Sequence, residues 1–209
     1  MAEFKYQQVE FLHSAAKLEQ LPEDVGVEVA FAGRSNAGKS SALNRLTGQR
    51  GLARASKTPG RTQLINLFGL SENCRLVDLP GYGFAKVSMQ VKKRWQQTLA
   101  QYLQQRKCLK GLVLLSDIRH PLKELDLNML DWAASEGLEV HLLLSKADKL
   151  KKGAQQKSLL GVKRILKLRY PDQDLIHTQI FSTLKNIGVP ELQKRLDSWF
   201  SQHQQVISE

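Results

Sequence analysis

The residues with the clearest chemistry form one stretch, Gly33-Arg34-Ser35-Asn36-Ala37-Gly38-Lys39-Ser40. It fits the pattern G-x-x-x-x-G-K-[ST], in which glycines let the backbone curl so that its N–H groups surround phosphate oxygens. We expect Lys39 to reach the β- and γ-phosphates of a nucleotide, the Ser40 hydroxyl to ligate Mg²⁺, and Ser41 to extend the same loop. A strand before the motif and a helix after it favour a phosphate-binding loop over a chance glycine-rich turn.

A second motif, Asp78-Leu79-Pro80-Gly81, ends an apolar strand 38 residues after the Lys-Ser pair. Alone, an Asp-x-x-Gly stretch is more often a turn. In this position we expect Asp78 to hold Mg²⁺ through a water. The Gly81 N–H would approach the γ-phosphate, because a glycine has no side chain to block it.

A loop rich in glycine, serine, threonine and arginine, residues 48–62, precedes the second strand. A threonine in such a loop can place its hydroxyl on Mg²⁺ and its N–H on the γ-phosphate, which lets the loop distinguish a triphosphate from a diphosphate. We assign this role to Thr62, beside Gly60 and Arg61, in preference to Thr58, because Thr62 stands next to the strand. Lys39, Thr62 and Gly81 are therefore the candidate catalytic residues, and Ser40 and Thr62 are the candidate metal ligands.

The stretch Ser145-Lys146-Ala147-Asp148 follows a third apolar strand. Guanine presents a ring N–H and an exocyclic amine that match the two acceptors of an Asp148 carboxylate, and adenine does not. The Lys146 stem would lie along the base. The alternative is a helix-capping aspartate beside a surface lysine. Phe181-Ser182-Thr183, after the last strand, are candidates to offer backbone N–H groups to the guanine oxygen.

Apolar runs and helical stripes alternate along the chain, which predicts an α/β domain: a mostly parallel six-stranded sheet with helices on both faces. We expect an N-terminal extension over residues 1–25 packed on the domain, the nucleotide-binding domain over 26–201, and a tail over 202–209. The expected strands lie at 26–32, 63–70, 75–79, 111–117, 140–144 and 178–181.

The chain of 209 residues carries a net charge of +11, and 42% of its residues are hydrophobic, so it can bury a core. It has no apolar run near the ~18 residues of a membrane span, and its start does not resemble a signal peptide. Two cysteines are too few for a disulfide framework. These features lead us to expect a cytoplasmic protein and a monomer.

Positive charge gathers in three stretches without an acid, 29–71, 79–116 and 149–171, which hold 22 of the 31 basic residues. Solvated helix faces of a basic protein are one explanation. The other is a polyanionic partner, meaning a nucleotide, a nucleic acid or both.

Taken in order, these elements resemble the translation-factor-related P-loop GTPases. The middle motifs, with Lys57-Thr58-Pro59-Gly60-Arg61-Thr62-Gln63, Asp78-Leu79-Pro80-Gly81-Tyr82-Gly83 and Asp117-Ile118-Arg119-His120-Pro121, resemble the bacterial EngB family, also called YihA or YsxC. The resemblance covers about residues 6–200. It implies a P-loop GTPase that binds GTP and GDP with Mg²⁺, helps to assemble the large (50S) ribosomal subunit through rRNA, and is linked to cell division and septation.

The sequence departs from related GTPases in its base motif and differs from one class of them at the water-positioning residue. Ser145 stands where these GTPases usually have Asn or Thr, which would weaken the tie between base loop and phosphate loop. Tyr82 stands where Ras-type GTPases have the glutamine that orients the attacking water. We therefore expect slow intrinsic hydrolysis, raised by ribosomal particles and by K⁺ held at Asn36. A loop residue without catalytic role is the alternative for Tyr82.

Two other functions stay open on the sequence alone. One is an ATP-dependent P-loop enzyme, against which Asp148 argues. The other is a nucleic-acid-binding module with a vestigial nucleotide site, which would leave Lys39 and Ser40 unexplained.

Overall fold

A computed structural model describes residues 4–53, 64–83, 89–171 and 174–204. In these residues seven strands form one sheet in the order β1-β3-β4-β2-β5-β6-β7. They are β1 (Glu10–Ala15), β2 (Val27–Gly33), β3 (Ile65–Ser71), β4 (Cys74–Asp78), β5 (Leu109–Asp117), β6 (Val140–Ser145) and β7 (Ile176–Ile180). β3 pairs antiparallel with β1 and with β4, whereas the pairs among β4, β2, β5, β6 and β7 are parallel.

The seventh strand is β1, and the expected count of six is wrong by one. Its side chains are mostly exposed, and Phe11 and Leu12 are each about half exposed. The segment therefore has no buried apolar run that a sequence pattern would reveal. It becomes a strand because β3 offers its free edge, and Glu10 lies opposite Gly69 in the resulting register.

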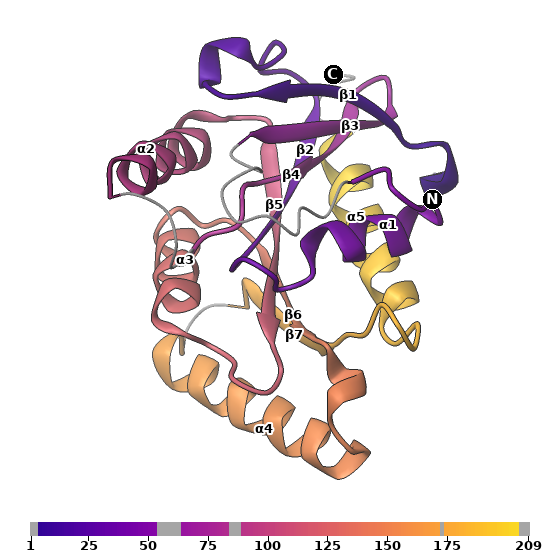
Figure 1. Cartoon of the computed structure of the whole chain (residues 1–209), viewed down its shortest axis with the longest axis vertical. Helices are drawn as coiled ribbons and strands as arrows, with labels where there is room; N and C mark the ends of the chain where they lie inside the picture. The colour runs from indigo at the N-terminus through magenta and orange to yellow at the C-terminus, as the bar shows by residue number, and fades with distance from the viewer. Residues whose placement is uncertain (1–3, 54–63, 84–88, 172–173, 205–209) are drawn as a thin grey trace.

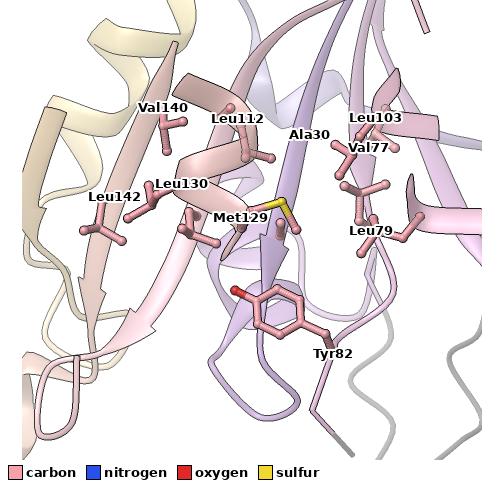
Figure 2. Close-up of a cluster of buried hydrophobic side chains, with 14 of the residues drawn as sticks. Ala30, Val77, Leu79, Tyr82, Leu103, Leu112, Met129, Leu130, Val140 and Leu142 are labelled. Atoms are coloured by element: carbon pink, nitrogen blue, oxygen red, sulfur yellow. The ribbon is translucent and has the colours of Figure 1, made fainter. Parts of the chain in front are cut away.

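Within the described ranges, five α-helices cover both faces of the sheet, and helices on both faces are what the sequence predicts (Figure 1). They are α1 (Lys39–Thr47), α2 (Met89–Gln105), α3 (Glu124–Ser135), α4 (Lys152–Arg169) and α5 (Val189–Gln204). α1 and α5 pack on one face, where Leu43 and Trp199 are buried. α2, α3 and α4 pack on the other, where Tyr102, Leu130 and Val162 are buried; Figure 2 shows part of this second core.

The central strands explain where the motifs meet. β2, β4 and β6 are buried along their whole length, as parallel strands covered on both faces require. Parallel strands end at the same edge of a sheet, so the segments that follow β2, β4, β5 and β6 lie together there. This edge is the usual ligand site of an open α/β sheet.

The opposite edge is held by a buried ionic cluster around Glu28, whose side chain is fully buried. Glu28 accepts hydrogen bonds from Arg75 (2.9 Å), Arg106 (2.7 Å) and the Tyr102 hydroxyl (2.8 Å). Burial is the largest single influence and opposes the charge of Glu28, but Arg106, Tyr102 and Arg75 together outweigh it and hold the pKa of Glu28 below its usual value. Arg106, from the second basic stretch, is thus neutralised inside the protein. No helix in the described residues is long and apolar enough to cross a membrane.

Candidate functional site

A cavity of about 360 Å³ lies at the carboxyl edge of the sheet and joins the three motifs. Of the residues predicted from the sequence, it is lined by Ser35, Asn36, Gly38, Lys39, Ser40, Ser41, Asp78, Leu79, Pro80, Gly81, Lys146, Asp148 and Thr183. Lys149 and Leu184, which the sequence analysis did not single out for the site, line it as well. Segments more than 100 residues apart thus share one hollow that suits an elongated polar ligand.

The phosphate-binding loop has the backbone that its glycines predict. Gly38 takes a positive φ of 104°, and α1 begins at the next residue, Lys39. The helix therefore points its N-terminus, with its unpaired N–H groups, at the cavity. Asn36 is exposed and also has a positive φ, 63°. Gly33, Arg34 and Ala37 do not line this cavity; Arg34 and Ala37 line a second cavity of about 240 Å³, which shares Ser35, Asn36 and Lys146 with the first.

The charges in the cavity fit an anion and a divalent cation. Burial lowers the pKa of Lys39 and raises the pKa of Asp78, although each charge partly supports the other. The Ser40 hydroxyl lies 3.4 Å from one Asp78 oxygen, and the other Asp78 oxygen, Oδ1, is buried without a partner in the described residues. Such hard oxygen donors suit Mg²⁺. Phosphate beside Lys39 and Mg²⁺ beside Asp78 would add to the partial support that these two charges give each other.

No group of three or more His, Cys, Asp or Glu side chains that could hold a metal occurs in the described part of the chain. A Mg²⁺ ion would therefore rest on Ser40, Asp78 and the oxygens of the bound nucleotide. The third predicted contributor, Thr62, lies outside the described residues with Gly60 and Arg61.

Gly81 lies directly against the phosphate-binding loop. A Cβ atom on Gly81 would stand 3.0 Å from the Lys39 Nζ and 3.2 Å from the Ser35 Cα. The site therefore has room for a glycine here and not for a larger residue without movement of the lysine. This close approach puts the Gly81 backbone where the sequence analysis places the end of the phosphate chain.

Ser145 ties the base motif to the phosphate loop, so the expected weakening of this tie needs revision. The buried Ser145 hydroxyl lies 2.8 Å from the Ala37 carbonyl oxygen, to which it donates, and 3.2 Å from that of Ser116. A serine is short, yet it reaches both, because β6 pairs with β5, with Asp117 opposite Ser145, and β5 pairs in turn with β2, the strand that leads into the phosphate loop.

The last loop orients Asp148 through a side chain, which the sequence analysis did not foresee. The Ser182 hydroxyl donates to Asp148 Oδ1 at 2.6 Å, and this bond lowers the pKa of Asp148. The N–H groups of Phe181 and Ser182 donate to the carbonyls of Leu144 and Ile187, so these two donors are already used inside the protein. Thr183, whose carbonyl accepts from Arg45, is then the candidate donor to a guanine oxygen.

Asp117 contacts the lysine of the base motif, and the sequence analysis gave this residue no role in the site. Its carboxylate pairs with Lys146 Nζ at 3.1 Å and accepts two hydrogen bonds from the Arg119 guanidinium. These Arg119 bonds, helped by Lys146, hold the pKa of Asp117 well below its usual value. Asp117 therefore fixes the lysine of the base motif. The signal in the sequence was the Asp-Ile-Arg-His-Pro run at a strand end.

Tyr82 is neither a mobile loop residue nor a base. It is 4% exposed, and its hydroxyl donates to Asp126 at 2.7 Å. Burial and the Asp126 charge raise the pKa of Tyr82 well above its ordinary value. The phenol therefore stays protonated at neutral pH and cannot accept a proton from an attacking water.

Comparison with known proteins agrees with this geometry. A family model described as a 50S ribosome-binding GTPase matches residues 28–146. The probable GTP-binding protein EngB of Vibrio parahaemolyticus serotype O3:K6 is 56% identical over 196 residues, which are 94% of this chain and 88% of that protein. The protein of the same name from Yersinia enterocolitica serotype O:8 is 57% identical over 199 residues, 95% and 90% of the two chains.

Two solved structures show the fold. A probable GTP-binding protein engB superposes with a TM-score of 0.67 at 22% identity, over 84% of this chain and 100% of that one. Aquifex aeolicus Era bound to GDP and aluminium fluoride gives a TM-score of 0.61 at 19% identity, over 84% and 57%. The fold is therefore that of a P-loop GTPase G domain. The sequence relatives go further: the chain belongs to the EngB family of GTP-binding proteins and is a GTPase.

Proposed function

We propose that this GTPase is a nucleotide-switched assembly factor for the large (50S) ribosomal subunit, acting in the cytoplasm as a monomer. The observation that carries the nucleotide part is the single cavity that joins phosphate loop, Gly81 and Asp148. The ribosomal part is supported by the description of the matching family, whose members are called 50S ribosome-binding GTPases.

Each side of the cavity has a task in binding GTP. Lys39 and the N-terminus of α1 would hold the phosphates, and Ser40 and Asp78 would hold Mg²⁺, which neutralises charge on the transferred phosphoryl group. Asp148 would select guanine through two hydrogen bonds. The Ser182 hydroxyl donates a hydrogen bond to Asp148 Oδ1, and this bond would fix the orientation in which the carboxylate meets the base.

Hydrolysis without a partner should be slow. The buried, protonated phenol of Tyr82 cannot position the attacking water as a glutamine does. Another group must therefore assist the attack of this water on the phosphate. We propose two sources: K⁺ held at the exposed Asn36, which would add positive charge near the phosphates, and a group from the ribosomal particle.

The surface that supports rRNA binding is the outer face of α4. Six cations are exposed on it or at its start: Lys151, Lys152, Lys157, Lys163, Arg164 and Lys167. Arg169 at its end is paired with Asp131 at 2.6 Å and contributes less. α4 lies at the periphery of the molecule, packed on β7, so this face stays open when the nucleotide cavity is filled (Figure 1).

Co-sedimentation with 50S subunits and their precursors in GTP, GDP or no nucleotide tests the switch. We expect binding in GTP and little in the other two states. The variant Lys163→Gln/Lys167→Gln should weaken binding and keep GTP affinity. Lys5→Gln/Lys17→Gln, which removes the same charge from two exposed lysines in another segment, is the control. Equal pelleting in all three nucleotide states would contradict the proposal.

Base specificity separates this function from an ATP-dependent enzyme. We expect GTP, and not ATP, to displace a fluorescent GDP analogue. Asp148→Asn should lose at least ~100-fold in GTP affinity, because an amide offers one acceptor and one donor to guanine's two donors. Chelation of Mg²⁺ should weaken GTP binding.

The link to cell division and septation, implied by the resemblance, forms part of the proposal as a consequence of ribosome assembly. Depletion of the protein should then raise the level of immature 50S particles before septation fails. The reverse order would contradict an indirect role.

A further inference from the structure

Tyr82 stands between two glycines at the point where the chain leaves the phosphate side of the site. On one side, Gly81 lies against Lys39. On the other, Gly83 takes a positive φ of 77°, and a Cβ there would stand 3.1 Å from Arg34 Nε. Tyr82 is thus a large, fixed side chain between two residues whose backbones have the freedom to turn.

The Tyr82 backbone is fastened to the phosphate loop. Its carbonyl oxygen accepts from the Ser35 N–H at 2.7 Å, and its own N–H donates to the Gly33 carbonyl at 3.2 Å. These two bonds form a parallel bridge centred on Arg34. The position of Gly81 relative to the loop therefore follows from where Tyr82 sits.

The Tyr82 side chain is fastened to helix α3. Its ring belongs to the same buried cluster as Met129 of α3, and Figure 2 shows the ring at one end of that cluster. Its hydroxyl donates to Asp126 Oδ1 at 2.7 Å, while Asp126 Oδ2 accepts from the Ser116 hydroxyl at 2.8 Å and from the Lys123 N–H at 3.3 Å. Asp126 is 1% exposed, so breaking the bond from Tyr82 would leave a buried charge with a lost partner.

We propose that Tyr82 is a positioning residue, whose hydrogen bond to Asp126 holds the Gly81 N–H at the place where it meets the terminal phosphate of GTP. The same contact joins Gly81 to the base motif, because the Ser116 hydroxyl bonds Asp126 while the Ser116 carbonyl lies 3.2 Å from the Ser145 hydroxyl. Asp126 and Ser116 would act through Tyr82, and neither lines the cavity that joins the three motifs.

The test compares two buried tyrosines that each bond a buried carboxylate. Tyr82→Phe removes the bond to Asp126. Tyr102→Phe removes the 2.8 Å bond to Glu28 at the opposite edge of the sheet and serves as the matched control. For each full-length variant we measure the Kd for GDP, the Kd for a non-hydrolysable GTP analogue, single-turnover GTP hydrolysis, and the thermal midpoint.

We expect Tyr82→Phe to lower the ratio of GTP-analogue affinity to GDP affinity by about tenfold, and to slow hydrolysis by about as much, since only the triphosphate reaches Gly81. Tyr102→Phe should lower the thermal midpoint and leave ratio and rate unchanged. A Tyr82→Phe protein with the wild-type ratio and rate would overturn the proposal, and so would a ratio that rises.

Asp126→Asn gives a second, milder variant, because it keeps an oxygen for the phenol and removes the charge. It should lower the ratio of GTP-analogue affinity to GDP affinity as well. The double variant with Tyr82→Phe should lower this ratio no further than Tyr82→Phe alone does. Additive losses would show that the two residues act separately and would overturn the proposed connection.

Discussion

Ser145→Ala probes the contact that joins the two halves of the nucleotide site. Ser145 is 3% exposed and Ala37 is 5% exposed, and the Ser145 hydroxyl lies 2.8 Å from the Ala37 carbonyl oxygen. Alanine fills almost the same space but leaves that carbonyl without the donor. Such a loss costs about 1–3 kcal/mol. We expect a fall of this size in the free energy of unfolding.

A part of this loss should appear in nucleotide binding. Ala37 belongs to the loop that must surround the phosphates. Without the Ser145 hydrogen bond, part of the binding free energy of the nucleotide is used to order this loop. Since about 1.4 kcal/mol equals a factor of ten, we expect the Kd for GDP to rise about tenfold and by no more than about 100-fold. Ser145→Thr keeps the hydroxyl and should restore most of the affinity.

Urea denaturation and titration of a fluorescent GDP analogue measure the two effects separately. Thr47→Val is the control, because it removes another buried hydroxyl, bonded to the Leu43 carbonyl at 2.9 Å, from the far end of α1. It should lower stability and leave GDP affinity unchanged. If Ser145→Ala behaved like Thr47→Val, with GDP affinity within twofold of wild type, the proposed role of this contact in binding would be refuted.

Three further predictions concern the fold. Gly111→Ala would place a Cβ 2.5 Å from two ring carbons of the fully buried Trp199, so it should lower the free energy of unfolding in urea by about 1–3 kcal/mol or more. Its control is Gly161→Ala on α4, where a Cβ meets nothing within 4 Å, and this variant should raise the free energy of unfolding by up to about 1 kcal/mol. Glu28→Gln removes the buried charge that pairs with Arg75 and Arg106, although Arg106 keeps Asp24 at 3.7 Å, and should cost about 3–5 kcal/mol; a loss below about 1 kcal/mol would show that the ionic cluster is dispensable. Burial lowers the pKa of His141 to about 4, aided by the charge of Arg195 and opposed by its bond to Gln179, so the unfolded state takes up the proton first. The resulting stability is complete above pH 6.5 and is lost as the pH falls toward 4, by up to about 3 kcal/mol, a dependence that His141→Asn should flatten.

The predicted site residues that line the cavity could be recognised in the sequence where they are contiguous. Lys39 follows Gly38, and Asp78 precedes Gly81 by three residues, so local backbone geometry alone brings these groups together. The residues that support them could not be read in this way. Tyr82 and Asp126 are 44 positions apart, and no local pattern pairs them. Ser182 was predicted as a backbone donor, but its N–H donates to the Ile187 carbonyl within the loop after β7, and its hydroxyl donates to Asp148 instead.

By itself the sequence determined the phosphate-binding loop, the α/β alternation, and the order of motifs that places the chain among GTPases. These features depend on residues within a few positions of each other and on whether a segment is apolar. The tertiary structure alone decided that the half-exposed segment Glu10–Ala15 is a seventh strand, since only the free edge of β3 makes it one. It also decided that Ser145 reaches Ala37, 108 residues away, because β6 pairs with β5 and β5 with β2, the strand that leads into the phosphate loop, and no stretch of sequence contains that distance.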